Sequence, residues 1–87
     1  PLVVDVREPR EFRQGHIPAA ALLPLPQLLA APAALPRDRP IVLACRSGRR
    51  SARAASLLRA QGFGELRVLA GGMLAWEGAN LLTAVEQ

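Results

Sequence analysis

The sequence predicts an α/β fold in which helices flank both sides of a parallel central sheet. Short β-branched apolar runs alternate with segments of helical composition, and this alternation favours right-handed βαβ units around a parallel sheet. Apolar residues make up 51% of the 87 residues and charged residues only 21%, which excludes a disordered chain. The length suits one domain, taken here as residues 1–87.

The first elements follow from local composition. Residues 2–6 are β-branched and apolar and end at charged residues, as a buried strand does. Residues 7–12 predict a short helix, because Pro9 is tolerated in a first turn. A Gly-His-Ile-Pro segment at 15–18 then turns the chain, and residues 20–23 are a candidate short strand.

The later elements are more regular. Residues 27–31 have helical composition and end at prolines, and the continuous apolar run 40–44 is typical of a strand buried on both faces. A long helix follows that run, with apolar residues on one face at i, i+3 and i+4, and Gly62 is a suitable stop for it. Residues 66–69 predict a further strand, and a last helix is expected around residues 73–77.

The positive charge of the chain gathers beside its only cysteine. All 11 basic residues are arginines, and 7 acidic residues leave a net charge of +4. One stretch of eight residues without an acid contains four of them: Arg46, Arg49, Arg50 and Arg53. A single cluster around Cys45 favours a small-anion site over a nucleic-acid surface, which would also need aromatic residues to stack on bases. A nucleic-acid partner is therefore not expected.

Composition also limits other classes of site. One cysteine excludes an internal disulfide, and with His16 as the only histidine no protein-only metal site is expected. No apolar run approaches the roughly 18 residues of a membrane span, so no membrane partner is expected. An unpaired thiol favours the cytoplasm. Pro1 leads straight into a strand-like run, which is typical of a piece of a longer protein, so export stays open.

The segment that carries chemistry reads Cys-Arg-Ser-Gly-Arg-Arg-Ser from Cys45 to Ser51, between a buried strand and the start of a helix. The first amide N–H groups of a helix lack intrahelical partners and bind anions. Gly48 lets the backbone curl so that successive amides converge. A Cys45 thiolate in that curl is stabilised by the amides, the helix dipole and the arginines. We therefore expect a lowered pKa and a nucleophile at neutral pH.

Several motifs, in order along almost the whole chain, resemble the rhodanese domain. They are Asp5-Val6-Arg7-Glu8, Glu11-Phe12, Gly15-His16-Ile17-Pro18-Ala19-Ala20, the loop 45–51, and Leu69-Ala70-Gly71-Gly72-Met73-Leu74-Ala75-Trp76. The loop matches the family pattern Cys-x-x-Gly-x-Arg at Cys45, Gly48 and Arg50. Two features depart from the family. Ala19 stands where glycine is common, and the chain starts late, without the leading N-terminal strand and helix usual for the family.

The resemblance implies an enzyme of the thiosulfate sulfurtransferase type. In that role Cys45 takes a sulfane sulfur from thiosulfate or a similar small donor, becomes a persulfide, and passes the sulfur to a thiophilic acceptor such as a thiol, cyanide or a protein thiol. No cofactor and no metal is implied. The substrate-binding residues that it implies are Arg46, Ser47, Gly48, Arg49, Arg50 and Ser51.

The arginines are expected to divide their roles. Arg46 and Arg49 would neutralise an incoming dianion, as guanidinium groups do for oxyanions, although a solvated place on the helix is an equal alternative for Arg49. Arg50 would turn inward and fix the loop by pairing with a supporting carboxylate, Asp5 or Glu8. An exchange of these roles among the arginines stays open.

The remaining candidates are interpreted as structural. His16 is expected to hold a turn by a hydrogen bond rather than act as a base, because a thiolate that has already formed needs no base. Met73 and Trp76 follow a glycine pair at helical spacing and are expected to cover the sheet.

Two other functions stay open. A cysteine phosphatase or arsenate reductase also places a cysteine at a helix N-terminus, but its loop holds five residues between Cys and Arg, whereas four separate Cys45 from Arg50. The other alternative is a non-catalytic rhodanese-like module that regulates or docks partners. The presence of Cys45 within a complete loop argues against that module.

Overall fold

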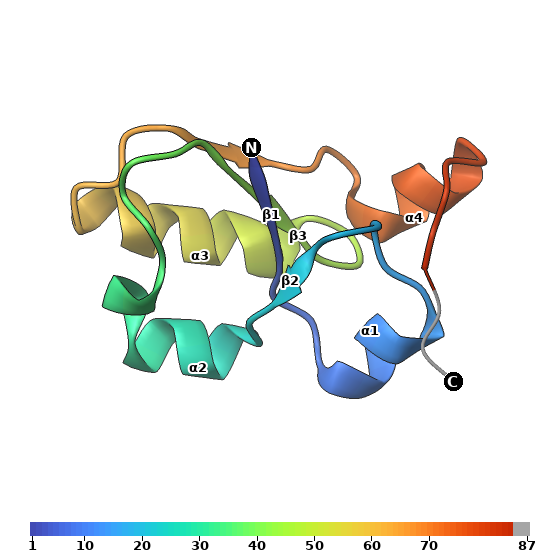
Figure 1. Ribbon diagram of the computed structural model, residues 1–87, viewed down its shortest axis with the longest axis horizontal. Helices are drawn as coiled ribbons and strands as arrows, with labels where there is room; N and C mark the ends of the chain where they lie inside the picture. The colour runs from blue at the N-terminus through green and yellow to red at the C-terminus, as the bar shows by residue number, and fades with distance from the viewer. Residues whose placement is uncertain (85–87) are drawn as a thin grey trace.

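The sheet has four strands, all parallel, in the order β2-β1-β3-β4. The computed structural model describes residues 1–84, and its strands are β1 (Leu2–Asp5), β2 (Ala21–Leu22), β3 (Ile41–Ala44) and β4 (Leu66–Val68). The central strands β1 and β3 pair in register from Leu2 with Ile41 to Asp5 with Ala44. They therefore end level, and the loops that follow them leave the same edge of the sheet (Figure 1).

Helices cover both faces of this sheet, which confirms the predicted fold class. They are α1 (Pro9–Gln14), α2 (Leu25–Ala30), α3 (Arg49–Ala60) and α4 (Gly72–Gly78), with a 3₁₀ turn at Pro32–Ala34 after α2. Leu28 of α2 and Leu58 of α3 pack with Leu43 on one face. Met73 of α4 packs with Ala44 on the other face. None of the helices within residues 1–84 is long and apolar enough to cross a membrane.

The segment after α4 is tied back to the turn after α1. Trp76 Nε1 donates to the carbonyl of Leu82 at 2.8 Å, and the backbones of His16 and Ala84 exchange hydrogen bonds of 2.9 and 2.7 Å. The buried His16 ring stacks on Phe12 with centroids 3.6 Å apart. Its Nδ1 donates to the Phe12 carbonyl at 2.7 Å, since a carbonyl only accepts. His16 holds the turn, as predicted.

Ala19 lies in the left-handed region of backbone space, at φ 67°. That conformation costs a residue with a Cβ roughly 1–2 kcal/mol, and glycine avoids the cost. The departure from the family pattern at Ala19 therefore falls at a turn that glycine would suit better, well away from Cys45 in the chain.

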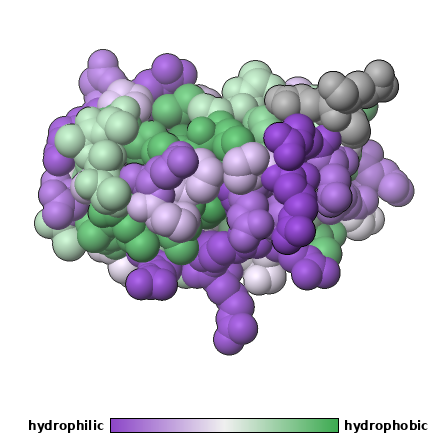
Figure 2. Space-filling view, turned by 90° about the horizontal axis from the view of Figure 1, so that it is seen from below, coloured by the Kyte–Doolittle hydropathy of each residue, from purple (hydrophilic) through white to green (hydrophobic). Residues whose placement is uncertain are grey.

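Polar and apolar surface are separated on the face that carries α1 and α2. Figure 2 shows apolar residues gathered over the α2 end and charged residues over the α1 end. The α2 end exposes alanine and proline, among them Pro26, Ala30 and Ala33, whereas α1 exposes Arg10 and Arg13. The charged end is the one that borders the cysteine loop.

Candidate active site

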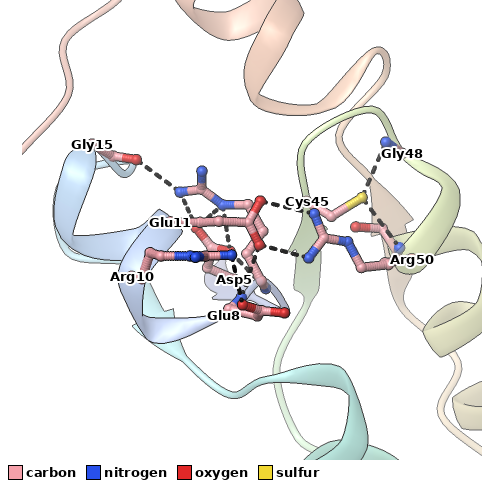
Figure 3. Close-up of polar contacts among 10 residues, drawn as sticks. Asp5, Glu8, Arg10, Glu11, Gly15, Cys45, Gly48 and Arg50 are labelled. Carbon is pink, nitrogen blue, oxygen red and sulfur yellow. Dashed lines mark hydrogen bonds and ion pairs between the residues drawn. The ribbon is translucent and has the colours of Figure 1, made fainter.

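The cysteine lies at the carboxyl edge of the sheet, immediately after β3. Gly48 adopts φ 101° as the residue that precedes α3, so the chain curls back around the sulfur. The amide of Gly48 donates to Cys45 Sγ at 3.0 Å and the amide of Ser51 at 3.4 Å (Figure 3). Cys45 is only 1% exposed. The sulfur therefore occupies the centre of a ring of backbone donors at the N-terminus of a helix.

Burial raises the pKa of the Cys45 thiol, but hydrogen bonding outweighs burial and the pKa is lowered overall. The Ser51 hydroxyl lowers the pKa most, followed by the amides of Ser51, Gly48 and Arg50. Ser51 is fully buried, and its Oγ has no partner of ordinary hydrogen-bond geometry within residues 1–84. A thiolate, and equally a persulfide, supplies the negative charge that this hydroxyl lacks.

A bidentate ion pair joins the loop to α1. Arg50 Nη1 donates to Glu11 Oε1 at 2.7 Å, and Nη2 donates to Oε2 at 3.0 Å (Figure 3). The hydrogen bonds from Arg50 lower the pKa of Glu11 to about 2, against the opposing effect of burial. The same contact raises the pKa of Arg50. The expected pairing of Arg50 with Asp5 or Glu8 is therefore wrong, because Glu11 in the first turn of α1 occupies the guanidinium.

Asp5 has a different partner. Its fully buried carboxylate accepts from Arg7 Nε at 2.9 and 3.1 Å, from Arg7 Nη2 at 2.9 Å and from the Arg7 amide at 3.0 Å. Arg7 Nη2 also donates to the Gly15 carbonyl at 2.7 Å. The pair therefore links the end of β1 to the residue that follows α1. Glu8 is exposed, lies 3.5 Å from Arg10, and donates its amide to Glu11 Oε1 at 3.1 Å.

Glu11 is the site residue that the loop motif alone does not reveal. The available signal is its spacing. Glu11 lies three residues after Glu8, the residue that precedes α1, and an acid at that position accepts a hydrogen bond from the free amide at the helix start, here that of Glu8. That geometry keeps the carboxylate at the start of α1, which faces the same sheet edge as the cysteine loop.

The other predicted loop residues lie at the rim. Arg46, Ser47 and Arg49 are exposed, and neither arginine forms an ion pair within residues 1–84. The first turn of α3 carries no acid to balance the positive end of the helix. The rim is therefore suited to hold an anion close to the sulfur.

Helix α4 fixes the start of the loop from the opposite side. The Met73 amide donates to the Cys45 carbonyl at 2.7 Å, and the Leu74 amide donates to the Arg46 carbonyl at 3.1 Å. Gly72 has φ 61°, and a Cβ there would collide with both of those carbonyls. Only glycine lets α4 approach this closely. Met73 thus positions the loop as well as covering the sheet.

A hollow of about 560 Å³ opens between α1 and α4, beside Arg46. Its lining also includes Arg10, Gln14, Leu74 and Glu77. Its volume falls within the range of small-molecule sites, about 300–1,000 Å³. Among residues 1–84, no three histidine, cysteine or acidic side chains come together in a way that could hold a metal ion.

Comparison with known proteins identifies relatives along most of the chain. The Rhodanese-like domain family matches residues 1–79. A protein of Allochromatium vinosum named sulfurtransferase is 44% identical over 75 residues, which is 86% of this chain and 70% of that protein. The thiosulfate sulfurtransferase GlpE of Pseudoalteromonas translucida is 35% identical over 78 residues, 90% of this chain and 74% of that one. The chain spans 60% of the length of a longer relative, YqhL of Bacillus subtilis, and 46% of the length of another, slr1261 of Synechocystis.

A solved structure supports the same relationship. The crystal structure of a rhodanese-related protein from Thermoplasma volcanium superposes with a TM-score of 0.92 at 30% sequence identity, covering 98% of this chain and 84% of that one. The family match runs from the first residue to the end of α4, so it includes the sheet, the cysteine loop and the helix that holds the loop. The chain belongs to the rhodanese family.

Proposed function

We propose that the domain is a sulfurtransferase that moves a sulfane sulfur from thiosulfate, or a similar small donor, to a thiophilic acceptor through a persulfide on Cys45. One observation carries the proposal: the sulfur is enclosed by the Gly48 and Ser51 amides at the N-terminus of α3, beside a fully buried hydroxyl. This is an arrangement for a small anionic sulfur species.

The first half-reaction is a displacement at sulfur. The Cys45 thiolate attacks the outer sulfur of thiosulfate, a sulfur–sulfur bond forms to Cys45, and the bond to the sulfonate sulfur breaks. Sulfite leaves with the electron pair, so charge and atoms balance. The ring of amides then holds the anionic persulfide. In the second half-reaction the acceptor takes the outer sulfur and restores the thiolate.

Each loop residue has a role in this proposal. The exposed Arg46 and Arg49 attract and neutralise the dianion at the rim. Ser47 and Gly48 shape the curl, and Gly48, Arg50 and Ser51 contribute the amides that lower the pKa of the thiol. The first strand–helix turn supports the loop through α1. Asp5 binds Arg7, and the Glu8 amide binds the Glu11 carboxylate, which in turn binds Arg50.

Thiosulfate is the proposed donor because of a named relative and because of the residues at the rim. The relative from Pseudoalteromonas translucida is named for thiosulfate, and a small oxyanion suits the arginine rim. We propose a thiol or cyanide as acceptor, and the cytoplasm as the compartment in which a single unpaired thiol stays reduced. Residues 1–87 act in this proposal as one catalytic unit.

Intact-mass spectrometry tests the covalent step. Incubation with thiosulfate should add the mass of one sulfur atom, and a thiol should remove it. Cys45→Ser should show neither the adduct nor turnover, while its circular dichroism matches that of the parent. Turnover that survives in Cys45→Ser would contradict the proposal, and so would a parent protein that never gains the sulfur.

A further inference from the structure

Two short helices hold the cysteine loop. Helix α4 binds the carbonyls of Cys45 and Arg46 through amides of its first turn, and α1 binds Arg50 through Glu11. Helix α1 has six residues and α4 has seven, whereas an isolated helix needs about 12–15 residues to be even marginally stable in water. Each helix therefore depends on contacts with the rest of the molecule to stay in place.

We call residues 79–84, which follow α4 and contact both helices, the strap. Asn80 adopts φ 57°, in the left-handed region, and the chain turns back there from the end of α4. The Asn80 amide donates to the Glu77 carbonyl at 3.0 Å and the Leu81 amide to the Trp76 carbonyl at 3.4 Å, the hydrogen-bond pattern of a Schellman helix end. The strap then runs to the turn after α1 (Figure 1).

Hydrogen bonds attach the strap to both helices. On the α4 side, Trp76 Nε1 donates to the Leu82 carbonyl at 2.8 Å. On the α1 side, the His16 amide donates to the Ala84 carbonyl at 2.9 Å, and the Ala84 amide donates to the His16 carbonyl at 2.7 Å. The Leu82 side chain is 81% exposed, so the backbone of the strap makes these attachments rather than the packing of that side chain.

We propose that the strap positions the cysteine loop, and that Trp76 is the positioning residue that fastens it to α4. The strap joins α1 to α4, α1 holds Arg50, and α4 holds the carbonyl of Cys45, so the contacts form a closed circuit through the loop. Beside Arg46 a hollow of about 560 Å³ lies between the two helices, so packing across that gap does not fix their separation.

Release of the strap should loosen the loop without unfolding the domain. Ile17, in the turn after α1, packs with Met73 of α4 independently of the strap. Loss of one hydrogen bond of this kind changes a local opening equilibrium by about two- to tenfold. The role of the strap rests on the sulfurtransferase function proposed above, since an organised loop serves catalysis only if Cys45 carries sulfur.

Amide hydrogen exchange, followed by NMR, measures the loosening without any sulfur chemistry. Trp76→Phe removes the Nε1 donor and keeps an aromatic ring over the sheet. The amides of Met73 and Leu74 hold the loop, so they should exchange about two- to tenfold faster than in the parent. The amides of β3 should keep the parent rate, because the strap does not hold the sheet. Alkylation of the buried Cys45 by iodoacetamide should also become faster.

A second variant cuts the strap at its other end. Ala84→Pro removes the amide that donates to His16, because proline has no N–H. It leaves Trp76 in place and should reproduce the exchange pattern of Trp76→Phe, so either variant decides the question if the other fails to fold. The strap acts only while both ends are attached. The double variant should therefore give less than the product of the two single effects.

Two control variants keep the strap attached. Leu82→Ala shortens an exposed side chain of the strap, and Arg37→Met removes a comparable exposed hydrogen bond, of 2.6 Å to the Gln61 carbonyl, at the far end of α3. Both should keep the parent rates of exchange at Met73 and Leu74 and of sulfur transfer from thiosulfate to cyanide. Both strap variants should transfer sulfur more slowly.

The outcomes separate the two proposals. Parent exchange rates at Met73 and Leu74 in the strap variants, equal acceleration in β3, or full additivity of the two cuts would overturn the role of the strap. A parent protein that forms no persulfide on Cys45 would instead overturn the sulfurtransferase function, whatever the exchange rates are.

Discussion

At the scale of single residues, Ser51 is the group whose environment is explained only by chemistry at Cys45. A buried hydroxyl without a partner normally costs about 1–3 kcal/mol. Here the Ser51 hydroxyl is fully buried and has no partner of ordinary hydrogen-bond geometry within residues 1–84, yet its interaction with Cys45 lowers the pKa of the thiol more than any single amide does. The cost is offset when Cys45 carries negative charge, as thiolate or persulfide. The resting thiol form is therefore the less well satisfied one.

Replacement of Ser51 by alanine should raise the pKa of Cys45. A hydrogen bond to a charged group contributes about 1.5–3 kcal/mol, so the midpoint of a thiolate absorbance titration should move up by about one pH unit. The folded pKa in the parent lies below the unfolded one, so the thiolate stabilises the fold above the unfolded pKa, and that stabilisation is lost as the pH falls through the folded pKa. Ser51→Ala should show less of this dependence. Ser47→Ala, exposed in the same loop, is the control, and an unchanged midpoint in Ser51→Ala would contradict the assignment.

At the scale of elements, the loop is held from two sides. On one side Arg50 grips Glu11 of α1, and on the other the first amides of α4 bind the carbonyls of Cys45 and Arg46. One contact holds the Arg50 side chain and the other holds the backbone of Cys45 and Arg46, so both ends of the loop are fixed. The ring of amides is therefore formed before any substrate arrives. This preorganisation is what an anionic intermediate requires.

Glu11→Gln should loosen the first of these contacts. The pKa of Glu11 falls from 4.5 to about 2 on folding, so its ionised form stabilises the fold above about pH 4.5, and that contribution is lost as the pH falls through about 2. The side chains of Arg50 and Glu11 are 35% and 23% exposed, so screening limits the loss at neutral pH to about 1–2 kcal/mol in urea unfolding. Below about pH 2 the variant and the parent should converge.

The comparison variant is Glu8→Gln. Its carboxylate makes only an exposed contact of 3.5 Å with Arg10, so its loss should change stability by less than about 0.5 kcal/mol. Sulfur transfer should slow in Glu11→Gln and not in Glu8→Gln. Equal losses in the two variants would mean that Arg50 is not held by Glu11 in solution.

At the scale of the whole molecule, the features that could be predicted from the sequence are those that neighbouring residues determine. Apolar runs predict the strands, glycine predicts the helix end, and the cysteine follows directly on a predicted strand. Each of these signals lies in a few consecutive residues, so the sheet and the loop were predictable. The partner of Arg50 was not, because Asp5, Glu8 and Glu11 all lie near the same edge and only packing selects among them. The start of α2 at Leu25 was missed because Pro24 and Pro26 suggest a loop, although proline also suits a first helical turn.

The domain should transfer sulfur from thiosulfate rather than hydrolyse phosphate esters, and the charge of the whole molecule does not make that distinction. The net charge of +4 attracts thiosulfate and phosphate esters alike, so raised salt should increase the KM for either anion.

The geometry of the cysteine loop separates the two anions. The Gly48 and Ser51 amides already approach the bare sulfur at 3.0 and 3.4 Å, and four residues close the ring from Cys45 to Arg50. A sulfane sulfur needs one atom in that ring, whereas phosphoryl transfer must bring three oxygens into it. Thiosulfate should therefore be consumed with cyanide as acceptor, measured as thiocyanate, while hydrolysis of an aryl phosphate stays at the level of Cys45→Ser. Faster hydrolysis of the aryl phosphate than consumption of thiosulfate would replace the sulfurtransferase proposal with a phosphatase.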